Sequence, residues 1–222
     1  MKMLSFRSVL LFACACSSYC AGCADAAGRF RQFEDRRAAL GDALGMAGAS
    51  GAGAGEDCRP PSPNVVQGLA LLALETSGGP GAPILFFGVV ETPELDGQTA
   101  VKYSYKALNT HDRHTEVGDP LLVGPYPIGE DGTFDAPTEE ATLPGEADAI
   151  LPGVPIVSQL TLHGTICGVS EFYCGTVTGN VKSPFSGPTQ GQFGLQLVKS
   201  LNDLPARPRY GCSEDALAPE LP

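Results

Sequence analysis

Val101-Lys102-Tyr103-Ser104-Tyr105-Lys106-Ala107 is the stretch of this chain that most clearly indicates its fold. Its odd-numbered positions are apolar or aromatic, whereas its even-numbered positions are lysine or serine. A period of two is typical of a β-strand that turns one face to a core and the other to solvent. The alternation therefore predicts a half-buried antiparallel strand over residues 99–108.

Seven further stretches have a similar character and end in short turns. The 28 glycines and 19 prolines favour many short strands over long helices. Leu95-Asp96-Gly97-Gln98 and Glu130-Asp131-Gly132 are typical hairpin turns. The sequence thus predicts an all-β domain over residues 64–200, an antiparallel meander of about eight strands that forms a closed barrel or a two-sheet sandwich. The candidate strands are 66–75, 83–92, 99–108, 119–128, 132–142, 155–166, 172–182 and 190–199.

The order of these strands over residues 65–200 resembles that of lipocalin-like and avidin-like barrels, although the tryptophan expected in both families is missing. The stretch Phe172-Tyr173-Cys174-Gly175-Thr176-Val177-Thr178-Gly179 is similar to a Cys-Gly-Thr-Val-x-Gly strand of uncharacterised exported bacterial proteins. These resemblances imply a barrel-like fold in the cell envelope. They imply no activity.

Two candidate strands are apolar on both faces. Residues 83–90 are almost entirely apolar, and residues 69–74 read Leu-Ala-Leu-Leu-Ala-Leu. The second segment is also compatible with a helix by propensity. A strand of this composition predicts that other parts of the chain cover both of its faces.

The first 26 residues have the layout of a secretory signal, with a basic start, an apolar run and small residues before a cleavage site. Ala24-Asp25-Ala26 predicts cleavage that releases a soluble chain. Cys20-Ala21-Gly22-Cys23 resembles a lipoprotein box, in which Cys23 would carry the lipid. Both routes remain open. Residues 27–63 then form a flexible tether with a possible short helix, and residues 201–222 form a C-terminal tail.

The four cysteines downstream of the signal predict two disulfides in an oxidising compartment. Three pairings are possible. We favour Cys167 with Cys174 across a hairpin, which leaves Cys58 to pair with Cys212. The alternative use is a metal site, but Cys167 and Cys174 lack the spacing of a zinc motif.

The charge of the chain argues against polyanionic partners. Its 14 basic and 25 acidic residues give a net charge of −11, so nucleic acid is not expected to bind. Residues 112–148 contain ten acidic residues and one basic residue, Arg113. This stretch predicts a solvated acidic face, with Ca²⁺ binding as the alternative. We expect no cofactor and no resident metal.

Histidine offers few sites for catalysis. His111 and His114 fall in a polar stretch that predicts a solvated hairpin tip. His163 shares a polar strand face with Gln159 and Thr161, and this face points either to solvent or into a polar lumen. We take His163, Gln159 and Thr161 as candidates for ligand binding. We assign no catalytic residue, because no nucleophile motif is present.

The leading hypothesis is an exported, non-enzymatic envelope module that binds a small ligand or a protein partner. The alternatives are a structural envelope protein and a hydrolase with an unrecognised site. Gly164, Gly175 and Gly179 are expected on the same faces of their strands as the apolar residues. If they point inward, they would leave room for a cavity inside a barrel.

Overall fold

The computed structural model describes residues 58–168 and 170–220, and within them the chain is almost entirely β. It contains ten antiparallel strands, two single-turn 3₁₀ segments and no α-helix in that part of the chain. The signal at residues 1–26, the anchor at Cys23 and the possible helix of the tether lie outside the described residues. The strands are β1 (Val65–Thr76), β2 (Ile84–Thr92), β3 (Glu94–Leu95), β4 (Gln98–Leu108), β5 (Glu116–Pro127), β6 (Thr133–Pro137), β7 (Ala141–Leu143), β8 (Ile156–Thr165), β9 (Phe172–Ser183) and β10 (Gly187–Val198).

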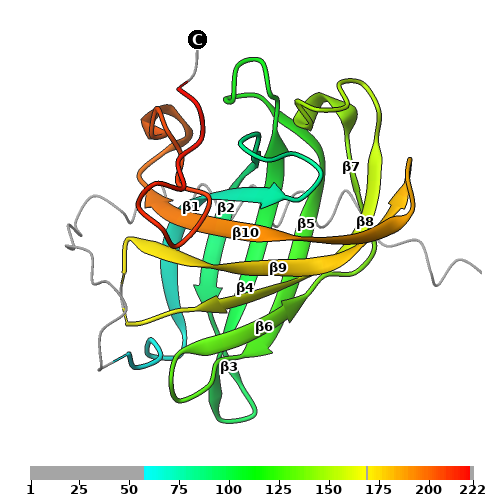
Figure 1. Ribbon diagram of the computed structural model, residues 1–222. Coiled ribbons are helices and arrows are strands. Elements are labelled where there is room, and N and C mark those ends of the chain that lie inside the picture. Colours follow the sequence, from blue (N-terminus) through cyan, green and yellow to red (C-terminus); the bar gives the residue numbers. More distant parts are fainter. Residues whose placement is uncertain (1–57, 169, 221–222) are drawn as a thin grey trace, which may run out of the picture.

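The strands form one curled sheet in the order β3-β4-β2-β1-β10-β9-β8-β6, with β5 on the outer side of β4 and β7 on β8. The last strand, β10, therefore returns to pair with the first. Figure 1 shows β6, β8, β9 and β10 crossing in front of β1, β2, β4 and β5. Strands β5 and β6 approach each other without a shared ladder among the described strands, so the barrel-like sheet has an open seam.

All eight predicted strands are present, and the predicted antiparallel meander is confirmed. The stretch 132–142 is divided into β6 and β7, and residues 69–74 are strand rather than helix. Asp96 and Gly97 both have positive φ and join β3 to β4, as predicted for a hairpin turn. The alternation in residues 101–107 places Tyr103 and Tyr105 inside the sheet, but the predicted solvent face is wrong at Ser104 and Lys106, which are also buried.

The glycines on the inner face do not open a cavity at their positions. A Cβ at Gly164 would lie 2.5 Å from the Phe134 ring and 2.8 Å from the Phe193 ring. A Cβ at Gly175 would lie 2.8 Å from Phe193. The two phenyl rings thus fill the space that these glycines leave, and this part of the interior is packed.

The outer face of β1 and β2 is covered by the chain that follows β10. Leu71, Phe87 and their neighbours on this face are buried, and Leu201, Leu204 and Tyr210 pack against them together with Val198, the last residue of β10. The two-sided apolar composition of residues 69–74 and 83–90 is explained by this cover. Residues 201–220, predicted as a tail, are therefore an integral part of the fold.

The predicted disulfide pairing is wrong, because the structure joins Cys58 to Cys167 and Cys174 to Cys212. Thr165 lies opposite Cys174 in the β8–β9 ladder, so Cys167 lies beyond the last residue pair of the hairpin. Tyr173 points into the core, so its neighbour Cys174 points outward, toward the C-terminal segment.

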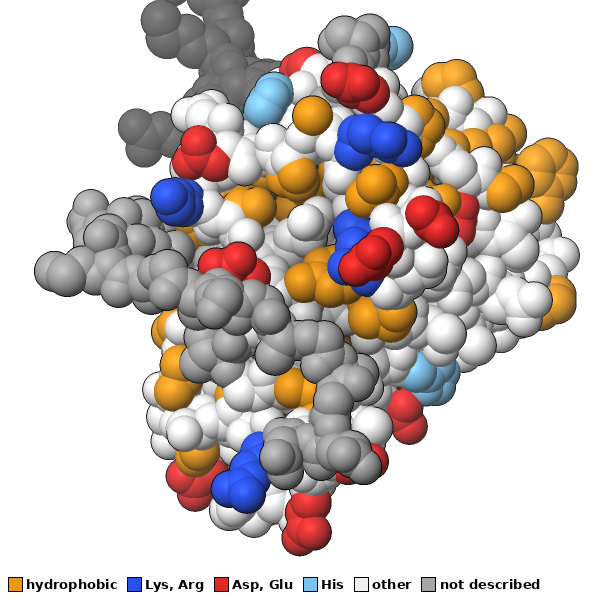
Figure 2. Space-filling view, turned by 60° about the vertical axis from the view of Figure 1, so that its left-hand side comes forward, with side chains coloured by type: hydrophobic (Ala, Val, Ile, Leu, Met, Phe, Trp, Pro, Cys, Tyr) orange, Lys and Arg blue, Asp and Glu red, His pale blue; other side chains and the backbone are white. Residues whose placement is uncertain are grey.

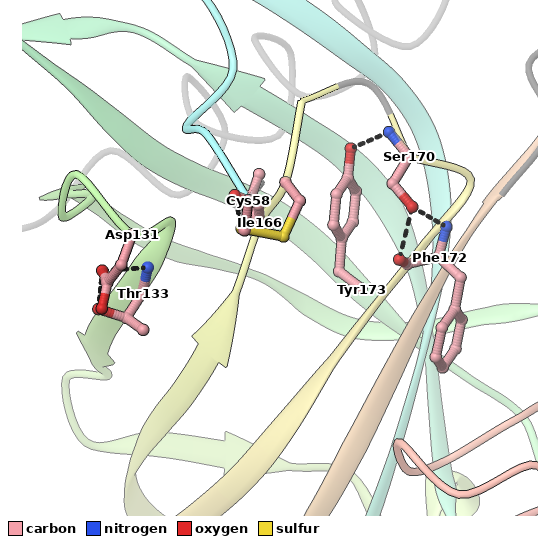
Figure 3. Close-up of a disulfide and its surroundings, with 8 residues drawn as sticks. Cys58, Asp131, Thr133, Ile166, Ser170, Phe172 and Tyr173 are labelled. Carbon is pink, nitrogen blue, oxygen red and sulfur yellow. Dashed lines mark hydrogen bonds between the residues drawn. A yellow bond between two sulfur atoms is a disulfide. The ribbon is translucent and has the colours of Figure 1, made fainter. Parts of the chain in front are cut away.

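The Cys58–Cys167 disulfide fastens the start of the described chain to the end of β8 (Figure 3). Gly132 lies against it with φ 78°, and a Cβ there would be 2.6 Å from the Cys58 sulfur. The Pro61 carbonyl also accepts a hydrogen bond from the Thr99 hydroxyl at 3.1 Å. Residues 58–63, predicted as the end of the tether, are thus attached to the sheet.

Candidate functional site

The candidate site is a cavity of about 120 Å³ inside the curled sheet. Residues on β1, β2, β4, β5, β7, β8, β9 and β10 line it, among them Leu72, Phe86, Leu121 and Leu162. The lining is apolar apart from hydroxyl groups, and none of the described residues that line it is charged. Such a cavity suits an uncharged, largely apolar guest.

Tyr103 and Tyr105 are two lining residues whose hydroxyls are fully buried and have no partner. They are two residues apart on β4, so both point inward, and their ring centroids are 5.5 Å apart in a stacked arrangement. The residues are 1% and 2% exposed, and neither hydroxyl makes a hydrogen bond. Burial raises the pKa of both phenols well above their ordinary value, with a smaller contribution from neighbouring tyrosines. Both groups therefore remain hydrogen-bond donors.

Tyr173 is a third buried tyrosine, and its hydroxyl is fully used. It donates to Gln67 Oε1 at 3.1 Å and accepts from the Ser170 backbone N–H at 3.3 Å. A buried tyrosine hydroxyl normally has such partners. Tyr103 and Tyr105 differ from Tyr173: both residues line the cavity, but their hydroxyl oxygens are closed off from it and are buried without a partner.

A second cavity of about 500 Å³ adjoins the first and opens at the end of the sheet that carries the β1–β2 and β9–β10 turns. Its lining becomes more polar and includes Ser77, Asp148 and Ser186. Phe185 and Ile150 also line it and are 72% and 43% exposed. We call the first space the inner cavity and the second the outer cavity.

The three residues that the sequence suggested for ligand binding lie on the other face of the sheet. Leu160 and Leu162 line the inner cavity, so the alternate residues Gln159, Thr161 and His163 point away from it. None of these three lines the inner or the outer cavity. Of the two orientations considered for this polar face, the structure shows the one toward solvent.

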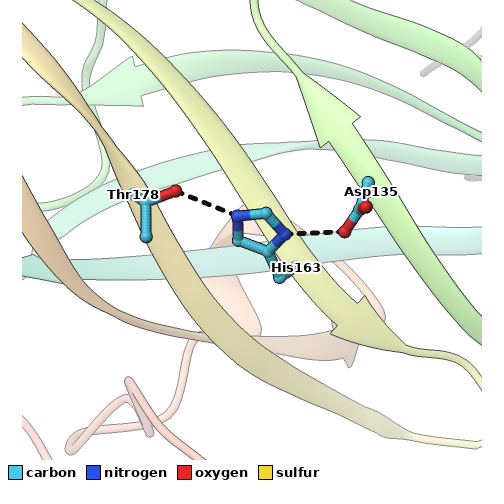
Figure 4. Close-up of polar contacts among 3 residues, drawn as sticks. All are labelled: Asp135, His163 and Thr178. Atoms are coloured by element: carbon cyan, nitrogen blue, oxygen red, sulfur yellow. Dashed lines mark hydrogen bonds and ion pairs between the residues drawn. The ribbon is translucent and has the colours of Figure 1, made fainter.

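His163 does make a well-defined contact on that outer face. Its Nδ1 lies 2.6 Å from Asp135 Oδ1, and its Nε2 lies 2.9 Å from Thr178 Oγ1 (Figure 4). The contact crosses three strands, because His163 is opposite Asp135 on β6 and lies diagonally from Thr178 on β9.

The order of an acid, an imidazole and a hydroxyl is that of a nucleophilic triad, but the surroundings required for catalysis are missing here. The side chains of His163 and Asp135 are 39% and 75% exposed on a strand surface. Neither cavity reaches them, and the neighbouring strand amides belong to the β6–β8–β9 ladders. A triad needs oxyanion donors and a bound substrate beside the nucleophile. We interpret the contact as cross-strand stabilisation.

The histidines at 111 and 114 lie in the β4–β5 turn, as expected. Hydrogen bonds from the Thr115 hydroxyl, the Thr115 N–H and the His114 N–H lower the pKa of Asp112 to about 2. His114 Nδ1 lies 3.0 Å from the Leu201 carbonyl oxygen. Within residues 58–168 and 170–220, no group of three or more His, Cys, Asp or Glu side chains is arranged to hold a metal.

Comparisons with protein-family models, with curated proteins and with solved structures find no match to this chain. In the described part of the chain, no helix has the length and apolar character needed to cross a membrane.

Proposed function

We propose that this protein is a non-enzymatic binding module whose inner cavity takes a small, uncharged, mostly apolar molecule. The observation that carries this proposal is the cavity of about 120 Å³ inside the sheet, whose described lining residues are mostly apolar and carry no charge.

The size and chemistry of the cavity support this class of ligand. An apolar cavity of about 150 Å³ in another protein accepts benzene, and the inner cavity is about 120 Å³. An aromatic ring or a short branched chain is therefore the expected guest. A carboxylate or phosphate would find no cationic group among the described residues that line the inner cavity.

The proposed setting is the envelope of a bacterial cell, reached through the signal at residues 1–26. Two disulfides are compatible with an oxidising, exported environment. Whether Cys23 carries a lipid decides between an anchored and a freely secreted protein. On the face drawn in Figure 2, the Lys and Arg side chains are scattered rather than gathered. With the net charge of −11, this argues for a small ligand or an envelope protein rather than nucleic acid as the partner.

Titration calorimetry with acetophenone and ethylbenzene tests the proposal. The two molecules have similar shapes, but only acetophenone carries an acceptor. We expect both molecules to bind, because both offer an aromatic ring to the apolar lining. The double variant Tyr103→Phe/Tyr105→Phe should leave both affinities unchanged, because the two hydroxyl oxygens do not reach the cavity surface.

A cavity-filling variant distinguishes binding inside the sheet from binding elsewhere. Ala141 lines the inner cavity, whereas Thr142, the next residue on β7, is exposed. Ala141→Phe should abolish binding, and Thr142→Phe should leave it unchanged. If neither molecule binds to the parent protein, or if Ala141→Phe still binds acetophenone, the structural alternative is favoured.

A further inference from the structure

The inner and outer cavities adjoin each other, which suits one ligand that extends from one space into the other. Six residues line both spaces: Leu74, Thr76, Ile84, Ile156, Val181 and Thr189. The lining changes from apolar to mixed along this path, because the outer cavity adds serine and aspartate to the wall. A ligand that follows the path would place an apolar end inside and a polar end outside.

Asp148 is the only charged residue among the described residues that line either cavity. It follows the short 3₁₀ turn at Gly145–Ala147, and only 2% of its surface is exposed. Its Oδ1 accepts one hydrogen bond, from the Ile150 backbone N–H at 2.8 Å. No Lys, Arg or His of the described chain lines either space.

None of the ion pairs among the described residues involves Asp148. The recorded ion pairs of lysine join Lys102 to Glu91, Lys106 to Glu116 and Lys182 to Glu140. Arg113 lines a neighbouring cavity beside Ala149, and no ion pair joins it to Asp148. A buried carboxylate is normally balanced by an opposite charge or several donors, and Asp148 has one backbone donor.

We propose that the natural ligand is a cationic amphiphile, whose apolar part occupies the inner cavity and whose ammonium group lies in the outer cavity against Asp148. This inference rests on the proposed function and adds the charge of the ligand to it. An ammonium group offers up to three N–H donors, and the second carboxylate oxygen of Asp148 is the acceptor it would use. The net charge of −11 also favours the approach of a cation and opposes that of an anion.

Three probes with one apolar part and different ends test this inference by calorimetry: phenylbutylamine, phenylbutanol and phenylbutanoate. The amine, protonated at neutral pH, should bind about tenfold or more tightly than the alcohol, in line with a hydrogen bond to a charged group. The carboxylate should bind more weakly than the alcohol. Asp148→Asn should reduce the affinity for the amine to that for the alcohol.

Asp148→Asn is a mild change, since the amide oxygen can still accept from the Ile150 N–H. Thermal unfolding of the variant verifies that it folds. Asp135→Asn, on the outer face beside His163, is the matched control and should leave all three affinities unchanged.

The outcomes separate this inference from the proposed function. Three results would overturn the proposal of a cationic ligand. They are equal affinity for the amine and the alcohol, tighter binding of the carboxylate, and an Asp148→Asn variant that still prefers the amine. In all three cases, the binding of acetophenone inside the sheet would still stand. Failure of all the probes and of acetophenone would instead remove the proposed function.

Discussion

Tyrosine has two opposite roles in the interior of this protein. The hydroxyl of Tyr173 bridges Gln67 and the Ser170 backbone, whereas those of Tyr103 and Tyr105 are buried without partners. Removing a hydrogen-bonded hydroxyl leaves its partners without a hydrogen bond, which lowers the free energy of unfolding. Removing a buried hydroxyl that has no partner removes an unfavourable desolvation free energy from the folded state. We therefore predict that Tyr173→Phe lowers the free energy of unfolding by about 1–3 kcal/mol.

Tyr103→Phe and Tyr105→Phe should leave the free energy of unfolding unchanged or raise it by up to about 1 kcal/mol. Urea denaturation of the three variants and the parent measures both effects. A loss for Tyr105→Phe as large as that for Tyr173→Phe would mean that a partner within the protein satisfies the Tyr105 hydroxyl.

The same two residues predict how stability depends on alkaline pH. Burial raises the pKa of Tyr103 and Tyr105 well above 10.0 in the folded protein, whereas in the unfolded chain they titrate near 10. Above pH 10 the unfolded state loses protons that the folded state retains, so the free energy of unfolding falls as pH rises. Each residue contributes about 1.4 kcal/mol per pH unit between the unfolded and the folded pKa.

Thermal unfolding across this alkaline range provides the measurement, with Tyr103→Phe/Tyr105→Phe as the reference, because lysines also titrate there. The parent protein should lose stability more steeply than the double variant. Parallel curves for the two proteins would contradict the predicted burial of the phenols.

The β8–β9 hairpin explains why the disulfide pairing could not be obtained from the sequence. The spacing of Cys167 and Cys174 fits a hairpin, but bridging depends on which residues face each other and on which face they lie. Thr165, not Cys167, lies opposite Cys174. Residues at 58 and 212 reach their partners only because both ends of the described chain return to the sheet. One sequence alone does not specify which residues face each other in the hairpin or where the two ends of the described chain meet the sheet.

The two disulfides should make separable contributions to stability. They connect residues 109 and 38 positions apart, so chain entropy alone gives upper values of about 5 and 4 kcal/mol. Cys58→Ala/Cys167→Ala should therefore destabilise the protein at least as much as Cys174→Ala/Cys212→Ala in urea denaturation. Peptide mapping without reduction should yield linked peptides for these pairs, and a Cys167–Cys174 peptide would contradict this arrangement.

The strands could be predicted from the sequence more readily than the inner cavity. Alternation in residues 101–107 is a local property, and it correctly placed both tyrosines on one face of β4. The sequence also predicted that residues 69–74 and 83–90 are covered on both faces, but it did not indicate which segment covers them. Whether the inner face encloses space depends on volumes summed over several strands. Phe134 and Phe193 close the region near the inner glycines and leave the cavity elsewhere.

At the scale of the whole molecule, the open seam predicts a gradient of stability across the sheet. Strands β5 and β6 each have one ladder partner, β4 and β8 respectively, whereas β1 is paired on both sides with β2 and β10. Amides at an edge open by local fluctuations, but those at the centre of a sheet exchange through larger unfolding events. Hydrogen exchange should therefore be slowest in β1 and its neighbours and fastest in β5, β6 and β7, by about two orders of magnitude or more.

The seam also borders the inner cavity, since Leu121 and Val123 of β5 and Ala141 of β7 line it. A ligand that contacts both sides of the seam should hold them together, so a saturating guest should slow exchange in β5 and β7 more than in β1. Nuclear magnetic resonance with and without acetophenone measures both effects on the same amides. If the amides of β5 and β6 exchanged as slowly as those of β1 without a guest, the seam between the two strands would be closed in solution. A guest could then enter the cavity only at the end of the sheet that carries Phe185 and Ile150.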